Sequence, residues 1–267
     1  MSDREGRETR GPNRTRLFRI TLGQKAKATL RRVRFSSGRR VGGIELSPLL
    51  SARQQRQLES WIRRLPPAFL ERIPRLKLAV AERLSLVRDI VLINERAAAT
   101  TASPVAHTHA ASYIVARYVV LQETLFDSRV ELGRILYHEL CHFLWPRLGN
   151  PKRRKFAALL QREFRQGTRG ELGYSSEWRK KKLTAVGSSQ LRKIRNQRLW
   201  QDYVCESFCD TGAYVLLGSE RRPNHSEFTL SRASRERRVQ LWVEMVFEDL
   251  SGSGEIFPGK GACVLSH

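Results

Sequence analysis

The chain has 267 residues, with 49 Lys and Arg against 26 Asp and Glu, and a formal net charge of +23 at neutral pH. This length is enough for one domain of moderate size with an extensive core. So strong a positive field attracts polyanions such as nucleic acid, an acidic membrane surface or an acidic protein. Apolar runs all fall short of the roughly eighteen residues that a membrane-spanning helix requires, so we expect no membrane span.

The charged residues at the N-terminus are followed by no apolar segment of the kind found in secretory signals. We therefore expect a cytoplasmic location, where cysteines stay reduced. The four cysteines include no C-x-x-C pair. Cys141, Cys205 and Cys209 are expected to be small core side chains.

Three regions are predicted. Residues 1–43 are dense in Arg and Lys and are interrupted by Gly, Pro and Ser, which predicts a flexible basic arm. Residues 44–250 are expected to form the folded domain. Residues 251–267 begin with a Ser-Gly repeat, which predicts a flexible tail.

The first half of the domain is predicted to contain two helical stretches and then strands. A helix is expected to start at Ser47, because the following proline favours the first helical position, and a second helical stretch is expected over residues 68–86. Residues 90–93, 113–115 and 118–121 are rich in β-branched and aromatic side chains, which predicts strands. The strands precede the most informative helix of the chain.

That helix is predicted over residues 129–145. Ser128 followed by Glu131 matches a capping box, apolar residues recur at helical spacing, and Pro146 ends the segment. It contains the pattern H-E-x-x-H, with His138, Glu139 and His142. Histidines four residues apart on a helix point from the same face, so two imidazole nitrogens can bind one zinc ion. Glu139 lies beside such a metal and can accept a proton from water.

A third metal ligand is predicted on a later helix that ends at Gly218. Glu206 and Asp210 are four residues apart there and share one face. The pattern H-E-x-x-H followed by E-x-x-x-D resembles the gluzincins, the zincin metallopeptidases related to thermolysin. The resemblance implies that Glu206 is the third zinc ligand and that Asp210 hydrogen-bonds a liganding histidine. It also implies a zinc-dependent peptidase with an α+β, zincin-like fold, mostly helical, with a small sheet before the H-E-x-x-H helix and an exposed strand that pairs with a peptide substrate.

The region between and after the two helices offers further candidates. A peptidase needs a donor for the oxyanion of its tetrahedral intermediate besides the metal, and Tyr174 and His225 are the two candidates. Residues 156–164 are predicted as a helix, residues 170–177 as a loop over the cleft, and residues 231–250 as the last helix.

Two other functions stay open. Three Lys/Arg runs between the metal helices and the basic arm favour a DNA-associated protease similar to the SprT-like enzymes, although those enzymes use a third histidine where this chain offers Glu206. Alternatively, the chain is a basic nucleic-acid-binding protein whose zinc is not catalytic. A fourth protein ligand such as Cys141 or Cys205 would close the site in that case.

Overall fold

The computed structural model describes residues 38–87, 90–93, 106–186, 194–221 and 225–247. Within these residues the protein is a mixed α+β structure that is mostly helical, with seven α-helices and a five-stranded sheet. Its strands are β1 (Arg40–Val41), β2 (Ile44–Leu46), β3 (Leu76–Ala81), β4 (Leu84–Val87), β5 (Ile90–Ile93), β6 (Ala106–His107), β7 (Ala110–Tyr113) and β8 (Tyr118–Gln122). Its helices are α2 (Ala52–Ile62), α3 (Pro67–Arg72), α4 (Arg129–Leu144), α5 (Asn150–Arg165), α6 (Tyr174–Val186), α7 (Ile194–Leu217) and α8 (Arg232–Phe247), with 3-10 turns η1 (Glu123–Asp127), η2 (Trp145–Arg147) and η4 (Gly218–Glu220).

The larger sheet has the strand order β1-β2-β3-β8-β7. Strand β3 runs parallel to both β2 and β8, whereas β7 pairs antiparallel with β8 and forms the edge of the sheet. Strands β5, β4 and β6 form a separate three-stranded sheet. All these strands precede α4 in the chain, so a small sheet before the motif helix is confirmed.

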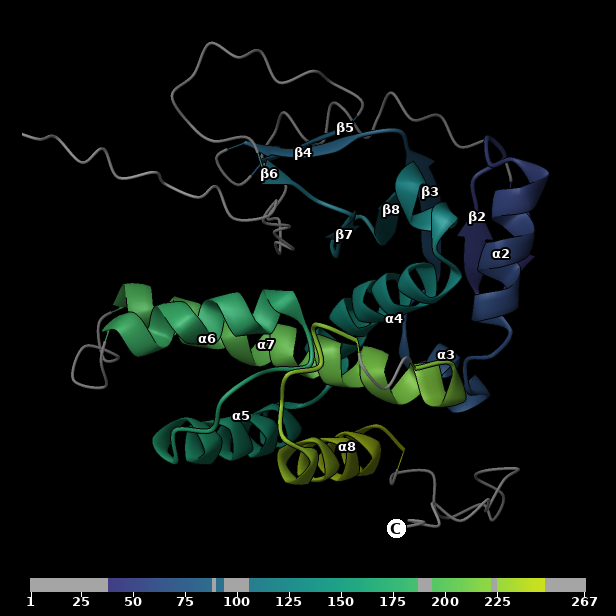
Figure 1. Ribbon diagram of the computed structural model, residues 1–267. Coiled ribbons are helices and arrows are strands. Elements are labelled where there is room, and N and C mark those ends of the chain that lie inside the picture. Colours follow the sequence, from purple (N-terminus) through teal and green to yellow (C-terminus); the bar gives the residue numbers. More distant parts are fainter. Residues whose placement is uncertain (1–37, 88–89, 94–105, 187–193, 222–224, 248–267) are drawn as a thin grey trace, which may run out of the picture.

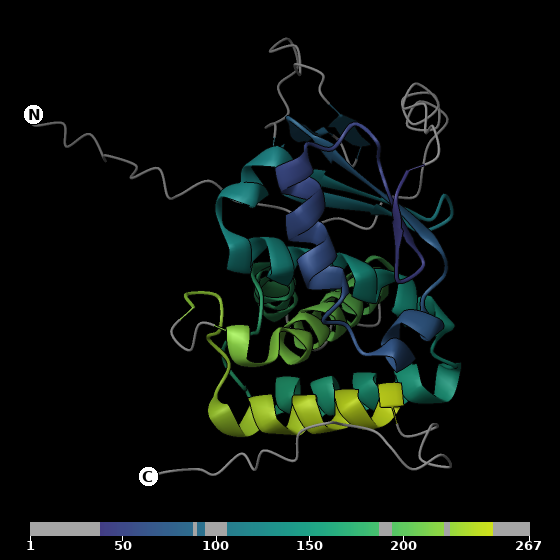
Figure 2. The same ribbon diagram turned by 90° about the vertical axis from the view of Figure 1, so that its right-hand side faces the viewer.

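The helices lie in layers against the larger sheet. In Figure 1, α4 lies between the sheet and α7, and α5 and α8 lie beyond α7; Figure 2 shows the same order from the side. Helix α4 contacts β7 on one side and α7 on the other, and α7 also contacts α6 and α8. One hydrophobic cluster extends from the sheet through these layers. Helices α4 and α7 are therefore central to the molecule.

Several sequence predictions are confirmed. The motif helix spans Arg129–Leu144, the strand at Ile90–Ile93 is present, and α8 covers most of the predicted last helix. The predicted helix at residues 156–164 lies within α5. No helix among the described residues is both long and apolar enough to cross a bilayer.

The prediction of a helical stretch over residues 68–86 is wrong. Only Pro67–Arg72 is helical, and the following residues form β3 and β4. Leu, Lys and Ala favour helices in isolation. Here Leu76–Ala81 pairs on both sides with distant strands, and this tertiary pairing outweighs the local preference.

The start of one helix and the cap of another also differ from expectation. Helix α2 begins after Ser51, whose hydroxyl accepts from the Gln54 N–H while Gln54 returns a bond to the Ser51 N–H. Ser47 instead is buried, and its N–H donates to the carbonyl of Leu78 at 2.9 Å. Ser128 is the N-cap residue of α4, as predicted, but its side chain makes no cap hydrogen bond; the Glu131 side chain contacts Arg134 and His225 instead of completing a capping box.

The predicted basic arm and tail lie mostly outside the described residues. Residues 1–37 and 251–267 are not among them. The last part of the expected arm is ordered into the sheet, because Arg40–Val41 forms β1 and pairs with β2.

The predicted loop over residues 170–177 is wrong in its second half, where α6 begins at Tyr174. Its first half contains a buried ionic cluster centred on Glu171, which is fully buried. Arg238 of α8 binds Glu171 through two nitrogens at 2.5 and 3.1 Å and binds Glu163 of α5 at 2.7 Å. Lys180 of α6 and Tyr203 of α7 also bind Glu171, at 2.9 and 2.6 Å.

The Glu171 cluster joins α5, α6, α7 and α8 through charge. Burial raises the pKa of Glu171, but Arg238, Lys180 and the Tyr203 hydroxyl lower it more, to about 2 from an ordinary 4.5. A carboxylate with a depressed pKa stabilises the fold fully above its ordinary pKa, and this stabilisation is lost as pH falls through the folded-state value. The loss is therefore expected between about pH 4.5 and 2.

Glu171→Gln should flatten the acid dependence of stability. The pKa shift of Glu171 contributes on the order of 3 kcal/mol to the free energy of unfolding at neutral pH, and the variant lacks this contribution. Urea unfolding at a series of pH values checks this, with the exposed Glu236→Gln as the matched control. If the free energy of unfolding falls equally steeply with pH in Glu171→Gln and in the wild type between pH 4.5 and 2, the assigned role of the cluster is contradicted.

Candidate metal centre

Helix α4 places the three residues of the H-E-x-x-H motif in the interior. His138, Glu139 and His142 are all buried. The two histidines lie one helical turn apart, and their Nε2 atoms are 3.1 Å from each other. The helix thus presents two imidazole nitrogens to one point beside α7.

Helix α7 brings the third donor to the same point. Oε2 of Glu206 lies 3.3 Å from Nε2 of His138 and 3.8 Å from Nε2 of His142. Ligand atoms bound tetrahedrally to zinc at about 2.0–2.1 Å are separated by about 3.4 Å. The three donors therefore match a zinc-sized ion, and among the described residues this group has no fourth protein donor.

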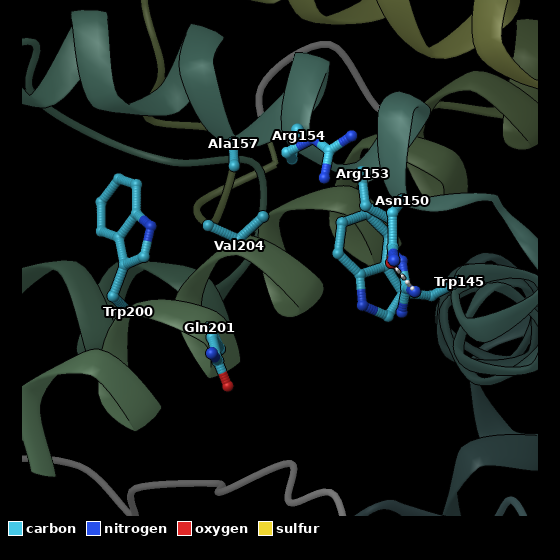
Figure 3. A pocket seen from close by; sticks show the side chains of 8 residues that line it. All are labelled: Trp145, Asn150, Arg153, Arg154, Ala157, Trp200, Gln201 and Val204. Atoms are coloured by element: carbon cyan, nitrogen blue, oxygen red, sulfur yellow. Dashed lines mark hydrogen bonds between the residues drawn. The ribbon is translucent and has the colours of Figure 1, made fainter. Parts of the chain in front are cut away.

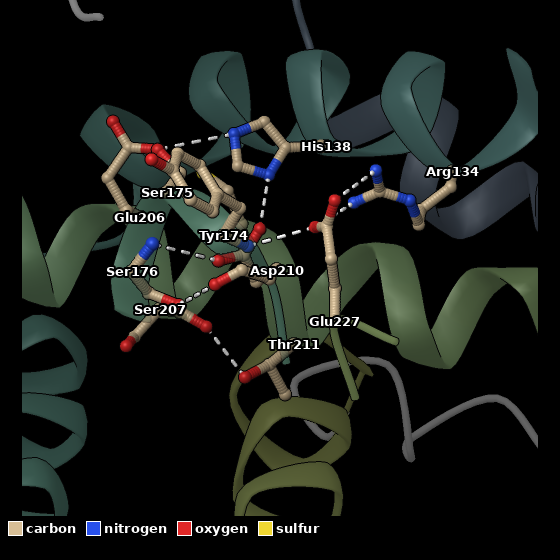
Figure 4. Close-up of polar contacts among 12 residues, drawn as sticks. Arg134, His138, Tyr174, Ser175, Ser176, Glu206, Ser207, Asp210, Thr211 and Glu227 are labelled. Atoms are coloured by element: carbon tan, nitrogen blue, oxygen red, sulfur yellow. Dashed lines mark hydrogen bonds and ion pairs between the residues drawn. The ribbon is translucent and has the colours of Figure 1, made fainter. Parts of the chain in front are cut away.

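Asp210 orients His138. Its Oδ1 lies 2.8 Å from Nδ1 of His138, on the ring edge opposite the other donors (Figure 4). A carboxylate in this position fixes the ring and leaves Nε2 free to bind metal. The N–H of Ser176, in the first turn of α6, donates to Oδ2 of Asp210 at 3.4 Å. The helix N-terminus favours the negative charge held there.

Helix α6 reaches Asp210 because residue 173 is glycine. A Cβ at Gly173 would lie 2.3 Å from the carboxylate carbon of Asp210, far inside van der Waals contact. Any larger residue would push α6 and Asp210 apart.

At the C-terminal end of α7, Gly218 adopts the positive φ of 54° that ends a helix, as the sequence predicts.

Helix α6 also holds Glu206. The Ser175 hydroxyl donates to Oε2 at 2.8 Å, and Arg179, itself buried, binds Oε1 at 3.1 Å. Burial raises the pKa of Glu206, but Arg179, His142 and His138 lower it more, so that the pKa lies well below its ordinary range. Glu206 is thus an ionised donor across the whole neutral range.

The carboxylates also set the charge state of the histidines when no metal is bound. Burial lowers the pKa of His138, but Asp210 and Glu206 raise it well above its ordinary value. Burial likewise lowers the pKa of His142, and Glu206 followed by Cys205 raises it. A cation bound by these histidines must therefore displace protons, so its affinity falls as the pH falls.

The carboxylate of Glu139 is held by the sheet. The hydroxyl of Ser112, on the edge strand β7, donates to Oε2 of Glu139 at 2.5 Å. Oε1 of Glu139 is buried and has no hydrogen-bond partner among the described residues. A buried carboxylate oxygen without a partner is costly, which indicates that this oxygen serves a bound molecule such as water.

Two thiols lie on the far side of the His142 ring. Sγ of Cys209 and Sγ of Cys205 are 3.4 and 3.7 Å from Nδ1 of His142. The cysteines are buried, as predicted, but they contact a metal-site histidine rather than only apolar core. A hydrogen bond with Cys209 lowers the pKa of Cys205 most, and the final pKa is about 6. Cys141 is not one of this group of donors, and its sulfur lies against Gly212.

The two candidates for the oxyanion donor differ in position. Tyr174 begins α6 next to Ser175, and its N–H donates to Glu227 at 2.9 Å. Nδ1 of His225 accepts from the Glu227 N–H, and its Nε2 lies 2.7 Å from Glu131. His225 thus uses both nitrogens near the start of α4, two turns before His138, whereas Tyr174 stays at the border of the site.

Sequence reasoning missed Ser112, Ser175 and Arg179 as partners of the site. Serine and arginine are too common for a single one to be informative. Two spacings in the sequence were the only available signals. Ser175 and Arg179 are four residues apart. Cys205 and Cys209 are also four residues apart, and they directly precede Glu206 and Asp210. No protein-family model, curated protein or solved structure matches this chain.

Gly173→Ala should weaken metal binding without touching a donor. The added methyl group displaces Asp210 from His138, and loss of such an orienting partner typically lowers metal affinity 10–100-fold. Competition with a chromophoric zinc chelator measures the affinity, and Gly149→Ala, whose Cβ has ordinary contacts, is the control. An unchanged affinity in Gly173→Ala would show that Asp210 does not orient the donor.

Proposed function

We propose that the protein is a zinc-dependent peptidase of the zincin type, in which His138, His142 and Glu206 bind the metal. The observation that carries the proposal is the approach of Glu206 to both histidines, with Asp210 behind the first one. The same four residues support the gluzincin pattern, because the third donor is a carboxylate. A structural zinc site is less well supported, because Cys205 faces Nδ1 of His142 and so lies on the wrong side of the ring to close this site.

The chemistry assigned to the residues follows from their contacts. When bound, Zn²⁺ supplies a Lewis acid that polarises a carbonyl group and makes water more acidic. Oε1 of Glu139 accepts a proton from water as the water attacks the peptide carbonyl, and Ser112 holds the other oxygen in place meanwhile. Glu139 then delivers this proton to the leaving amine.

The position of β7 suits a peptide substrate. This strand forms the edge of the larger sheet in the described residues, and its Ser112 contacts Glu139. All four residues of β7 are buried, so an extended peptide can add to this edge through main-chain hydrogen bonds only where the residues that cover the strand move aside. A substrate bound there would pass beside the proposed general base. Because main-chain hydrogen bonds would hold it, recognition would require little of the substrate's amino-acid sequence.

A peptidase screen with matched variants tests this proposal. Glu139→Gln should keep the zinc content of the wild type but lower kcat/KM by about 10²–10⁴-fold, because only the general base is lost. Glu206→Gln should lose the zinc equivalent bound by the histidine and carboxylate donors as well as activity, whereas the exposed Glu236→Gln should retain both. Metal content by mass spectrometry and new N-termini from a peptide library are the measurements. Loss of zinc in Glu139→Gln, or hydrolysis unaffected by it, would contradict the assigned roles.

Some residues of the predicted basic runs are buried in the fold or paired with acids, and this bears on how a polyanion could bind. Arg179 and Lys180, part of one predicted basic run, are buried and bind Glu206 and Glu171. In another run, Lys155 is paired with Glu244. The buried Arg179 and Lys180 therefore belong to the fold and are not part of a nucleic-acid surface, whereas Lys155 keeps an exposed side chain.

One pocket nevertheless favours nucleic acid as a second partner of the proposed peptidase. The pocket has a volume of about 380 Å³, lies between η2, the start of α5 and α7, and is lined by no acidic residue. Figure 3 shows the indoles of Trp145 and Trp200 on two sides, with Arg154 between them and Arg153 beside the largely buried Trp145, 6.0 Å from its ring centroid. Aromatic rings that stack on bases and guanidinium groups that bind phosphates are typical of sites for single strands.

Replacing both pocket arginines should weaken binding to a single-stranded oligonucleotide. In Arg153→Gln/Arg154→Gln, two phosphate contacts are lost, so the slope of log K against log salt should fall in magnitude by about 1.4. Fluorescence anisotropy at several salt concentrations measures this. Arg56→Gln/Arg75→Gln removes the same charge from exposed positions elsewhere. Equal effects of the two double variants would show that only net charge matters and that the pocket is no binding site.

A further inference from the structure

The face that α7 turns toward α4 carries two kinds of donor in parallel rows. Glu206 and Asp210 form one row, and both contact His138. Cys205 and Cys209 each precede one of these acids by one position, and both contact His142. The two acids therefore contact His138, and the two thiols contact the Nδ1 edge of the His142 ring.

The thiol row and His142 have the spacing of a metal site. A tetrahedral ion bound to sulfur at about 2.3 Å and to nitrogen at about 2.0 Å separates these ligands by about 3.5 Å. The measured distances from Nδ1 of His142 are 3.4 Å to Cys209 and 3.7 Å to Cys205. All three donor atoms lie within 4.8 Å of one another, and all three residues are buried.

We propose that Nδ1 of His142 and the sulfurs of Cys205 and Cys209 form a second metal site, which takes a thiophilic ion such as Zn²⁺ or Cu⁺. Thiolate and imidazole donors prefer such ions to Mg²⁺ or Ca²⁺. The second site uses a different nitrogen of His142 from the one that faces His138 and Glu206. His142 can therefore bridge two ions, and this bridging, unlike the thiol site itself, rests on the proposed zinc site.

The protons balance as follows when the second site fills. Each thiol releases one proton to solvent and binds the ion as a thiolate. With an ion at each nitrogen, His142 also releases its last ring proton and becomes an imidazolate. With Zn²⁺ in both sites, the ion in the second site offsets the two thiolates, and the ion in the carboxylate site offsets the Glu206 carboxylate and the imidazolate, so the buried cluster does not accumulate negative charge.

A cobalt titration of the full chain separates the two sites. Co²⁺ replaces Zn²⁺ in both kinds of site, but only thiolate ligands give a strong sulfur-to-cobalt charge-transfer band in the near ultraviolet. The wild type should bind two equivalents and develop this band. Cys205→Ser/Cys209→Ser should bind one equivalent without the band, whereas Cys141→Ser, which removes a thiol outside the group, should behave as the wild type does.

Glu206→Gln distinguishes failure of this proposal from failure of the proposed function. The variant should lose the equivalent bound by the carboxylate site and keep the charge-transfer band. A wild type that binds one equivalent and shows no band would overturn the second site, because the thiols would then only hydrogen-bond to His142, and would leave the peptidase site intact.

X-ray absorption of the wild type loaded with two equivalents of Zn²⁺ tests for sulfur ligands at the second site without any variant. The expected spectrum has a sulfur shell at about 2.3 Å in addition to nitrogen and oxygen at about 2.0–2.1 Å. A spectrum with only the shorter shell would overturn the proposal even if the double cysteine variant failed to fold.

Discussion

The contact between α4 and α7 is the constraint on which the rest of this structure depends. Two imidazoles from one helix meet two carboxylates from the other in the buried interior. Buried charges are tolerated only when they are paired, so the two helices can pack here only in a register that brings acids to histidines. The same register assembles the metal donors, which means that helix packing and donor geometry are fixed by one set of contacts.

The other helices hold this register. Helix α6 lies along α7 and supplies the serine and arginine that bind Glu206, as well as the first-turn N–H that binds Asp210. The edge strand β7 reaches Glu139 from the opposite side through Ser112. Each donor is thus held by a residue from a separate element, so the geometry is established by the fold before any ion binds.

The sequence predicts the part of this arrangement that depends on helical spacing. His138 with His142, and Glu206 with Asp210, repeat every four residues, and helix geometry alone brings each pair to one face. What spacing cannot show is which face of α7 meets α4. Cys205 and Cys209 repeat as regularly as the acids, and they were predicted to be core thiols although they contact His142.

The errors in the fold have the same origin in long-range contacts. Residues Leu76–Ala81 favour a helix locally, and only their pairing with β2 and β8 makes them a strand. Glu171 and Tyr174 lie in a stretch whose glycines suggested a loop. Their environment is set by Arg238, Tyr203 and Glu227, which lie far away in the sequence.

The buried cluster around Glu171 has a consequence for the identity of the donors. Tyr203 and Ser207 anchor α7 to Glu171 on a side away from α4, and so they fix the rotation of α7 about its own axis. Successive residues of a helix differ by about 100°. A rotation of one such step would put sulfur where oxygen now stands and would change a hard ligand set into a soft one. The class of metal that the proposed centre would prefer is thus encoded in the phase of a helix, and an ionic anchor remote from the centre keeps that phase.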